Sequence, residues 1–416
     1  MLIPMLNKLI KEETPKRTPR PLTPFTLFIG SISYLGVGVL NPIMPALIEG
    51  RYGGTAFHVG LMYTTLATAQ FIGSPVIGLL SDRYGRRLVL MFSLLGAAIA
   101  YTLMGIGGAL WMMFAGWAIF GIADGTASSI FAYIADTATL KARTRAFAFM
   151  SAATGMGFTI GPIISARFAS IDLAIPLYIV AATSVVGLVW AYWAMPETFP
   201  DNPRVARVSF RQLNPLSQLF VDWRNPHLRW LMLSFLLTTM TSIITSSNLA
   251  AMTNDLFGWQ PQQIAPIFIL MGVVEVLAQV SIVPVLLHFL REIQITSLGA
   301  IMLSIAFGLF GWFSLTGLPA LVYIAAIVAN IGTALVEVSL QGLMSKAVAP
   351  EAQGRIQGTY RATFALGRII GPLWAGWLYQ EISPAMPYWI GAGQMILVSI
   401  LTWFAASKLQ HKGNAQ

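Results

Sequence analysis

Long apolar segments alternate with short polar ones along most of the chain. Twelve of these segments are bounded by Gly, Pro or charged residues and are long enough to form a membrane-crossing helix. They cover 25–47, 58–80, 88–108, 110–134, 146–169, 173–195, 229–253, 263–287, 295–315, 319–343, 358–379 and 387–407. A helix needs about 20 apolar residues to cross a hydrocarbon core of roughly 30 Å. The pattern therefore predicts an all-α membrane protein with twelve transmembrane helices.

The predicted spans fall into two bundles of six helices. The first bundle occupies 25–195 and the second 229–407, and a linker rich in Pro and Arg, 196–228, joins them. Residues 1–24 and 408–416 are expected to be cytosolic tails. The first tail contains basic residues and prolines but no apolar core with a cleavage site, so we do not interpret it as a signal peptide.

The composition of the chain agrees with a membrane location. It is 56% hydrophobic and 10% charged, with a mean hydropathy of +0.70, whereas soluble proteins carry about 25% charged residues. The chain has no cysteine, which excludes disulfides and thiolate metal sites. Its histidines show no metal-binding spacing, and it contains no phosphate-binding Gly-x-x-x-x-Gly-Lys-Ser/Thr motif. We therefore expect neither a cofactor nor an enzymatic activity, and no direct use of ATP.

The basic residues are distributed unequally between the two sides of the predicted membrane. Only Arg51 and Arg167 fall on one side, and Arg361 and Arg368 lie within a span, whereas the other Lys and Arg residues fall on the opposite side. The positive-inside rule places both termini in the cytosol, and we expect a bacterial inner membrane. The basic pI therefore reflects topology, and no soluble basic face is left to bind nucleic acid.

An internal repeat relates the two predicted bundles. The sequence from Gly157 to Pro162 is matched 210 residues later by the sequence from Gly367 to Pro372, and Arg145 matches Arg355 at the same offset. Small residues at this spacing allow close packing of helices. The residues expected to pack helices in this way are Gly157, Gly161, Pro162, Gly367, Gly371 and Pro372.

The loop after the second span contains a conspicuous charged motif. It reads Gly78-Leu-Leu-Ser-Asp82-Arg83-Tyr-Gly85-Arg86-Arg87-Leu-Val-Leu90. This sequence resembles the signature of the major facilitator superfamily between its second and third helices. The resemblance implies two bundles related by an axis along the membrane normal, with the substrate site between them near the midplane.

The resemblance also implies that this motif is a gate latch. In the family, the aspartate of the motif contacts the start of the eleventh helix, and an arginine pairs with an acid at the end of the fourth. Here these residues are Asp82, Arg86 and Asp136. Such contacts would close the cytosolic side and must break for inward opening. The full set of expected latch residues is Gly78, Asp82, Arg83, Gly85, Arg86, Arg87 and Asp136.

Further segments resemble the tetracycline/proton and drug/proton antiporter branch of this superfamily. They are 36–45 in the first span, 155–162 in the fifth, and 340–345 with 353–358 around the loop after the tenth. Two positions depart from the branch: Ser33 stands where relatives carry an acid, and Trp117 where they carry an arginine. Proton coupling must then use other acids within the spans.

The acids expected to carry the proton are Asp124, Glu275 and Glu337. Each lies within a predicted span, and an ionisable group at bilayer depth costs at least about 2.5 kcal/mol, which makes it a functional candidate. A carboxylate in a cavity that alternates between wet and dry can take up and release a proton. The alternative is structural, because these acids could pair with bases across helices, as Glu337 could with Arg361 or Arg368.

Polar and basic residues within the spans are candidates for a substrate cavity. Arg361 and Arg368 are seven residues apart, which places them on one face of a helix. For each polar residue the alternative is an ordinary interhelical hydrogen bond. The candidates are Asn41, Gln70, Trp117, Gln279, Asn330, Gln341, Arg361 and Arg368.

The leading functional hypothesis is a monomeric, proton-coupled exporter of small amphipathic or organic molecules that works by alternating access in the lipid bilayer. One alternative is a transporter of an anionic metabolite, with Arg361 and Arg368 as counter-charges. Another is a membrane sensor that no longer transports.

Overall fold

Helices make up nearly all of the computed structural model, which describes residues 24–137, 140–197, 222–348 and 352–413. These ranges contain no strand. Most of the predicted N-terminal tail and of the predicted linker, 1–23 and 198–221, lie outside the described residues. The all-α fold that the apolar pattern predicts is confirmed.

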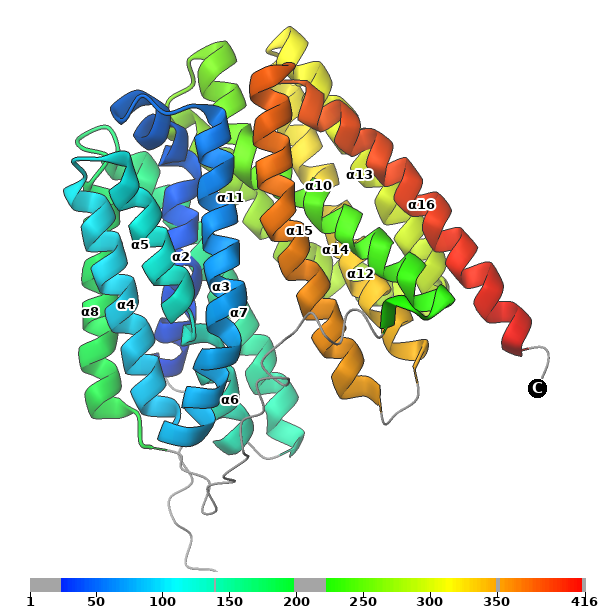
Figure 1. Ribbon diagram of the computed structural model, residues 1–416, viewed down its shortest axis with the longest axis horizontal. Coiled ribbons are helices and arrows are strands. Elements are labelled where there is room, and N and C mark those ends of the chain that lie inside the picture. The colour runs from blue at the N-terminus through cyan, green and yellow to red at the C-terminus, as the bar shows by residue number, and fades with distance from the viewer. Residues whose placement is uncertain (1–23, 138–139, 198–221, 349–351, 414–416) are drawn as a thin grey trace, which may run out of the picture.

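By the element order of the described residues, the first bundle contains six predicted crossings (Figure 1). The fourth crossing is divided between two helices, and the first ends in a π-helix. The elements are α2 Pro24–Pro45 with η1 Ala46–Arg51, α3 Ala56–Tyr84, α4 Arg86–Ile106, α5 Leu110–Ala123 with α6 Thr126–Thr137, α7 Leu140–Phe168 and α8 Ile175–Ala194.

The second bundle repeats this plan. One crossing is divided here too, but it is the second one, and a π-helix divides it. The last helix continues six residues past the predicted boundary at 407. The elements are α10 Pro226–Phe257, α11 Pro261–Leu277 with η2 Ala278–Ile282 and α12 Val283–Phe289, α13 Glu292–Thr316, α14 Pro319–Lys346, α15 Gln353–Glu381 and α16 Met386–Gly413.

Ten of the described crossings are long and apolar enough to span a membrane. The two outside this set are α3 and α15, which carry polar residues such as Gln70 and Asp82 or Arg361 and Arg368. These two helices lie side by side between the bundles (Figure 1), where a polar face meets protein and not lipid. Their lower hydropathy therefore follows from their position.

The repeated glycines pack helices within each bundle. A Cβ atom at Gly157 would lie 1.8 Å from the carbonyl oxygen of Ser31, so α7 approaches α2 closely at this point. In the second bundle, a Cβ atom at Gly371 would lie 2.6 Å from Ile243 Cγ2 and 2.9 Å from the carbonyl oxygen of Met240, so α15 also lies close to α10, though less tightly. Gly161 and Gly367 make corresponding contacts, and Pro162 and Pro372 lie inside α7 and α15.

The two bundles meet mainly along two helix pairs, α3 with α15 and α7 with α11, and α10 also contacts α2. Thr55 donates to Gln380 (2.6 Å) and Thr64 to the carbonyl of Ile369 (2.8 Å), which joins α3 to α15. We call the end of the molecule that carries the 78–90 motif the motif end, and the other the opposite end. The ribbons of α3 and α15 are close toward the opposite end and diverge toward the motif end (Figure 1).

Candidate functional site

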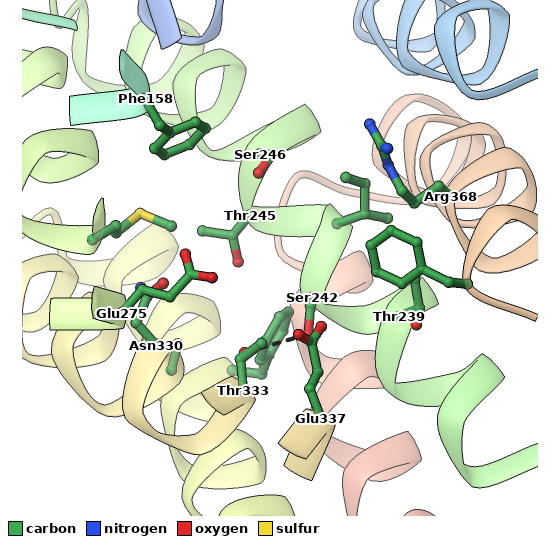
Figure 2. A pocket seen from close by; sticks show the side chains of 15 residues that line it. Phe158, Thr239, Ser242, Thr245, Ser246, Glu275, Asn330, Thr333, Glu337 and Arg368 are labelled. Atoms are coloured by element: carbon green, nitrogen blue, oxygen red, sulfur yellow. Dashed lines mark hydrogen bonds between the residues drawn. The ribbon is translucent and has the colours of Figure 1, made fainter. Parts of the chain in front are cut away.

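A cavity of about 160 Å³ lies near the middle of the molecule, mostly within the second bundle (Figure 2). Phe158 from the first bundle closes one side of it, and Arg368 enters from α15 (Figure 2). One face of α10 supplies hydroxyl groups, because its Thr and Ser residues recur at helical spacing. The lining consists of Phe158, Thr239, Ser242, Ile243, Thr245, Ser246, Met271, Glu275, Phe307, Ala329, Asn330, Thr333, Glu337, Phe364 and Arg368.

Two of the predicted proton carriers, Glu275 and Glu337, point into this cavity from α11 and α14 (Figure 2). Gln279, one turn further along, donates weakly to Glu275 at 3.3 Å. None of the salt bridges found among the described residues includes either acid. The pairing of Glu337 with Arg361 or Arg368 that the sequence allowed is therefore not formed in this state.

Arg368 is instead held by the first bundle. Its Nη1 atom donates to Gln70 Oε1 at 3.0 Å, and Gln70 Nε2 donates to Asp124 Oδ2 at 2.8 Å. The Gln70 amide thus bridges a cation on α15 to a carboxylate on the fourth crossing. This hydrogen-bonded chain joins the two bundles next to the cavity, and we call it the Asp124–Gln70–Arg368 bridge.

Both divided crossings are interrupted beside a predicted proton carrier. Helix α5 ends at Ala123, and Asp124 follows with a non-helical backbone (φ −69°, ψ 84°) before α6 begins at Thr126. The π-helix η2 begins three residues after Glu275. Interrupted helices and π-helical turns are frequent where transporters bind ions or substrates, because they free backbone groups and redirect side chains.

The other predicted cavity residues are placed elsewhere. Asn41 is buried and accepts a hydrogen bond from Tyr63 (2.7 Å), whose ring meets that of Trp117 edge-on at 5.5 Å. Trp117 is 1% exposed and belongs to the apolar core of the first bundle. Both residues therefore face the interior of their own bundle and not the cavity.

Two further candidates lie nearer the motif end. Gln341 donates to Gln357 at 3.1 Å, a contact between α14 and α15 of the same bundle. Arg361 is exposed and does not line the cavity. Asn330 does line it, but its side-chain amide donates to the carbonyl of Ala326 (2.8 Å) within α14. Of the eight predicted cavity residues, only Asn330 and Arg368 contribute to this cavity.

The motif after α3 forms a charged cluster at its own end of the molecule. Arg86 pairs with Asp82 (2.6 Å) and with Asp136 at the end of α6 (3.1 Å), and it also donates to Ser81 (2.9 Å). The side chain of Asp82 is 68% exposed, and a Cβ atom at Gly78 would meet nothing within 4 Å. The Arg86–Asp136 pair is therefore formed, whereas no contact from Asp82 to α15 is found among the described residues.

The remaining motif residues anchor the turn between α3 and α4. Gly85 has φ +96°, a conformation that favours glycine. Arg87 contacts the carbonyl of Tyr192 on α8 and stacks over the Tyr192 ring at 5.1 Å, and its backbone N–H donates to Glu197 (3.4 Å). Arg83 lies over the ring of Tyr84 (5.3 Å).

The second bundle has charge contacts that sequence reasoning missed. Glu292 at the start of α13 pairs with Lys346 at the end of α14, which repeats the Arg86–Asp136 arrangement with the charges exchanged. Arg355 pairs with the buried Asp222 at 3.1 Å. The repeat that matches Arg145 to Arg355 was the only signal for this pair, and the side chain of Arg145 lies outside the described residues.

Comparison with known proteins identifies relatives across nearly the whole chain. A sequence model of the Major Facilitator Superfamily matches residues 26–369 and, in a second match, 291–416. The class H tetracycline resistance protein of Pasteurella multocida is 29% identical over 374 residues, covering 88% of this chain and 90% of that protein. A human major facilitator superfamily domain-containing protein 10 is 26% identical over 436 residues, covering 99% of this chain and 90% of that protein.

The fold is shared with solved transporter structures. The nucleoside transporter NupG superposes with a TM-score of 0.74 at 16% sequence identity, covering 92% of this chain and 99% of that one. At this identity the similarity shows the fold alone. The arrangement of two six-helix bundles around a central cavity is thus that of a known class of membrane proteins.

Proposed function

The chain belongs to the major facilitator superfamily, and from this premise we propose that it is a proton-coupled exporter of small amphipathic organic molecules. The protein is a multi-pass membrane transporter and not an enzyme. The proposal concerns what it carries, in which direction, and what drives it. Its similarity to tetracycline resistance proteins, which covers 88% of the chain, supports export of an organic compound.

The Asp124–Gln70–Arg368 bridge is the observation that carries the proposal for proton coupling. Gln70 donates to Asp124 and accepts from Arg368, an orientation that suits an ionised carboxylate on one side and a guanidinium on the other. A proton on Asp124 removes the negative charge and weakens the acceptor. Because the bridge connects the two bundles, its strength, and with it the contact between the bundles, depends on the protonation of Asp124.

The charges of the cavity favour a cationic or neutral substrate. Glu275 and Glu337 face the cavity without a salt bridge among the described residues, whereas Arg368 is already engaged by Gln70. Phe158, Phe307 and Phe364 add apolar aromatic surface, against which an organic cation gains roughly 0.5–2 kcal/mol when it is desolvated.

The alternative is an anionic substrate. Arg368 lines the cavity, and it would become a counter-charge if Gln70 released it. Arg361 lies seven residues before Arg368 on the same face of α15 and is exposed. It would extend such a site toward the motif end. This arrangement would require Glu275 and Glu337 to be protonated when the anion binds, since two ionised carboxylates would repel it.

The membrane setting is part of the proposal. We place the motif end in the cytosol because the basic residues lie there, and we place the protein in a bacterial inner membrane as a monomer. In this orientation α3 and α15 diverge toward the cytosol (Figure 1), the side from which an exporter loads its substrate.

Inverted membrane vesicles with an imposed proton gradient test this function. Uptake is measured for cationic dyes, tetracyclines and small carboxylates, with a protonophore as the control that collapses the gradient. We expect uptake of a cation or a neutral amphipath that the protonophore abolishes. Uptake of carboxylates alone would favour the anionic alternative, and uptake that persists with the protonophore would rule out proton drive. If no compound is transported, the sensor interpretation gains support.

A further inference from the structure

Two acids from different bundles meet at the opposite end, and neither of them lines the cavity. Glu49 lies in η1, at the end of the first crossing, and Asp255 lies in the last turns of α10. The carboxyl groups of these residues lie within hydrogen-bonding reach of each other. Glu49 is partly buried, and its Oε1 atom is buried without a hydrogen-bond donor. The pair therefore forms an acid-to-acid contact between the bundles.

A tyrosine distinguishes the two acids. Tyr379 on α15 is 6% exposed, and its hydroxyl group donates to Asp255 Oδ2 at 2.7 Å. No such donor to Glu49 Oε1 is found among the described residues, so we assign the shared proton to Glu49 when the two carboxyl groups touch. Asp255 is exposed to the water at this end, which gives the proton a route of exchange.

No base neutralises the pair. No salt bridge among the described residues includes Glu49 or Asp255. Arg51, two residues from Glu49, points toward the loop at Gly107. A Cβ atom added at Gly107 would lie 3.2 Å from the Cζ atom of Arg51. Tyr388 is the other titratable group beside Tyr379, and it carries no positive charge. Two carboxylates in contact without a cation cannot both be ionised at low cost, so they share a proton.

The contact lies where the two bundles are closed against each other. At the same end Thr55 on α3 donates to Gln380 on α15 at 2.6 Å. A Cβ atom at Gly60 would lie 2.3 Å from the carbonyl oxygen of Pro372, so the two helices touch backbone to backbone. Opening this end must separate α3 from α15, and with them Glu49 from Asp255.

We propose that Glu49 and Asp255 form a second proton-binding site, which locks the opposite end closed while it holds a proton. Closing this end takes up a proton, because the approaching carboxylates must share one. Opening the end releases the proton to the water on that side, since each acid can then ionise alone. By linkage, acidic solution favours the closed end and alkaline solution favours its opening. This site is separate from Asp124, and it requires only that the bundles move relative to each other.

The distance between the bundles at this end tests the proposal. The chain has no cysteine, so spin labels can be attached to Ile171→Cys in the first bundle and Leu318→Cys in the second, two exposed positions in loops at the opposite end. Distance distributions are measured by double electron–electron resonance between acidic and alkaline pH in lipid nanodiscs. The variants Glu49→Gln and Asp255→Asn are compared with Glu381→Gln, which neutralises an exposed acid at the end of α15.

We expect a longer distance to appear in the labelled protein as the pH rises. Glu49→Gln and Asp255→Asn should each keep the short distance over the whole range, because a neutral amide in place of either acid removes the repulsion. Glu381→Gln should behave like the parent. The proposal fails if the parent shows no change in distance with pH, or if both pair variants open with pH as the parent does. Transport measurements do not enter this test, so its outcome is independent of the proposed substrate and coupling.

Discussion

The side-chain amide of Gln70 links the two bundles beside the cavity. It connects Asp124 of the first bundle to Arg368 of the second with hydrogen bonds of 2.8 and 3.0 Å. Its two functional groups are both used, which a shorter or charged side chain cannot reproduce. The bridge depends on an amide at this position.

Replacement of Gln70 by leucine should therefore lower transport strongly. It leaves a carboxylate and a guanidinium without their shared partner, which costs about 1–3 kcal/mol in the described state. Substrate uptake and thermal unfolding of the purified protein measure the two effects. Gln341→Leu is the matched control, since it breaks a 3.1 Å bond between two helices of the same bundle. Equal transport loss in both variants would contradict a special role for the bridge.

The two arginines of α15 should differ in effect. Arg368 lines the cavity and is bonded to Gln70, whereas Arg361 is exposed. Arg368→Gln should reduce transport about tenfold or more, the equivalent of roughly 1.4 kcal/mol, while Arg361→Gln should stay near the parent rate. Initial rates of uptake decide between them. A loss in Arg361→Gln as large as that in Arg368→Gln would instead support the anionic-substrate alternative.

At this scale, the sequence predicted acids within the spans, but it did not predict which polar residues line the cavity. Asp124, Glu275 and Glu337 were identified because an acid within a span is unusual. Trp117 and Asn41 were placed in the cavity because their helix faces could not be distinguished by composition, and the structure places them in the core of the first bundle. Glu49 and Asp255 were missed because each lies at a span end, where an acid is ordinary.

At the scale of the helices, glycine positions separate permanent packing from packing that changes. Gly157 and Gly371 lie against backbone atoms of the neighbouring helix in the same bundle. Gly78 belongs to the motif on α3 and has open space where a side chain would be. The open space at Gly78 is explained if α3 and α15 approach each other at this position when the motif end closes.

Alanine at these two kinds of glycine should have different effects: it should lower stability at Gly157 and leave stability unchanged at Gly78. Gly157→Ala places a methyl group 1.8 Å from the Ser31 carbonyl oxygen, and overpacking of this kind costs about 1–3 kcal/mol or more. Gly78→Ala should unfold at the parent temperature but slow transport, because the added methyl group hinders closure of the motif end. Thermal unfolding and uptake are measured on both variants. Normal stability of Gly157→Ala, or normal transport by a bulkier Gly78→Leu, would argue against this distinction.

The helices themselves were largely predictable from hydropathy, because lipid imposes long apolar segments with internal backbone hydrogen bonds. The interruptions were not. The break at Asp124 and the π-helix after Glu275 lie inside segments that remain apolar on average. Their positions depend on contacts with neighbouring helices, such as the bond from Gln70 to Asp124, which are distant in sequence.

At the scale of the whole molecule, the structure is closed at the opposite end and separated at the motif end. Thr55 with Gln380 and Gly60 with Pro372 join the bundles at the first, whereas Asp82 and Gly78 have no partner from the other bundle at the second among the described residues. The pairing of bundles could be expected from the internal repeat, but the state of opening could not. Hydropathy is the same in every state of a transporter, since the same residues face lipid.

Alternating access in this molecule would then break the contacts at the opposite end and form new ones at the motif end. The Asp124–Gln70–Arg368 bridge lies between these two sets of contacts. The bridge lies between the two ends and connects the bundles in the present state. The coupling account requires that protonation of Asp124 decide whether the bridge persists. Neutralising Asp124 permanently should allow the bundles to exchange states but should separate this exchange from the proton gradient.

The most direct test compares two modes of transport in vesicles that contain the Asp124→Asn variant. The first mode is accumulation driven by a proton gradient, and the second is exchange of labelled for unlabelled substrate without a gradient. We expect the variant to lose accumulation and to retain exchange, while the parent protein shows both. Accumulation by Asp124→Asn at the parent level would contradict the account, and loss of accumulation in Glu275→Gln alone would assign the proton to Glu275 instead.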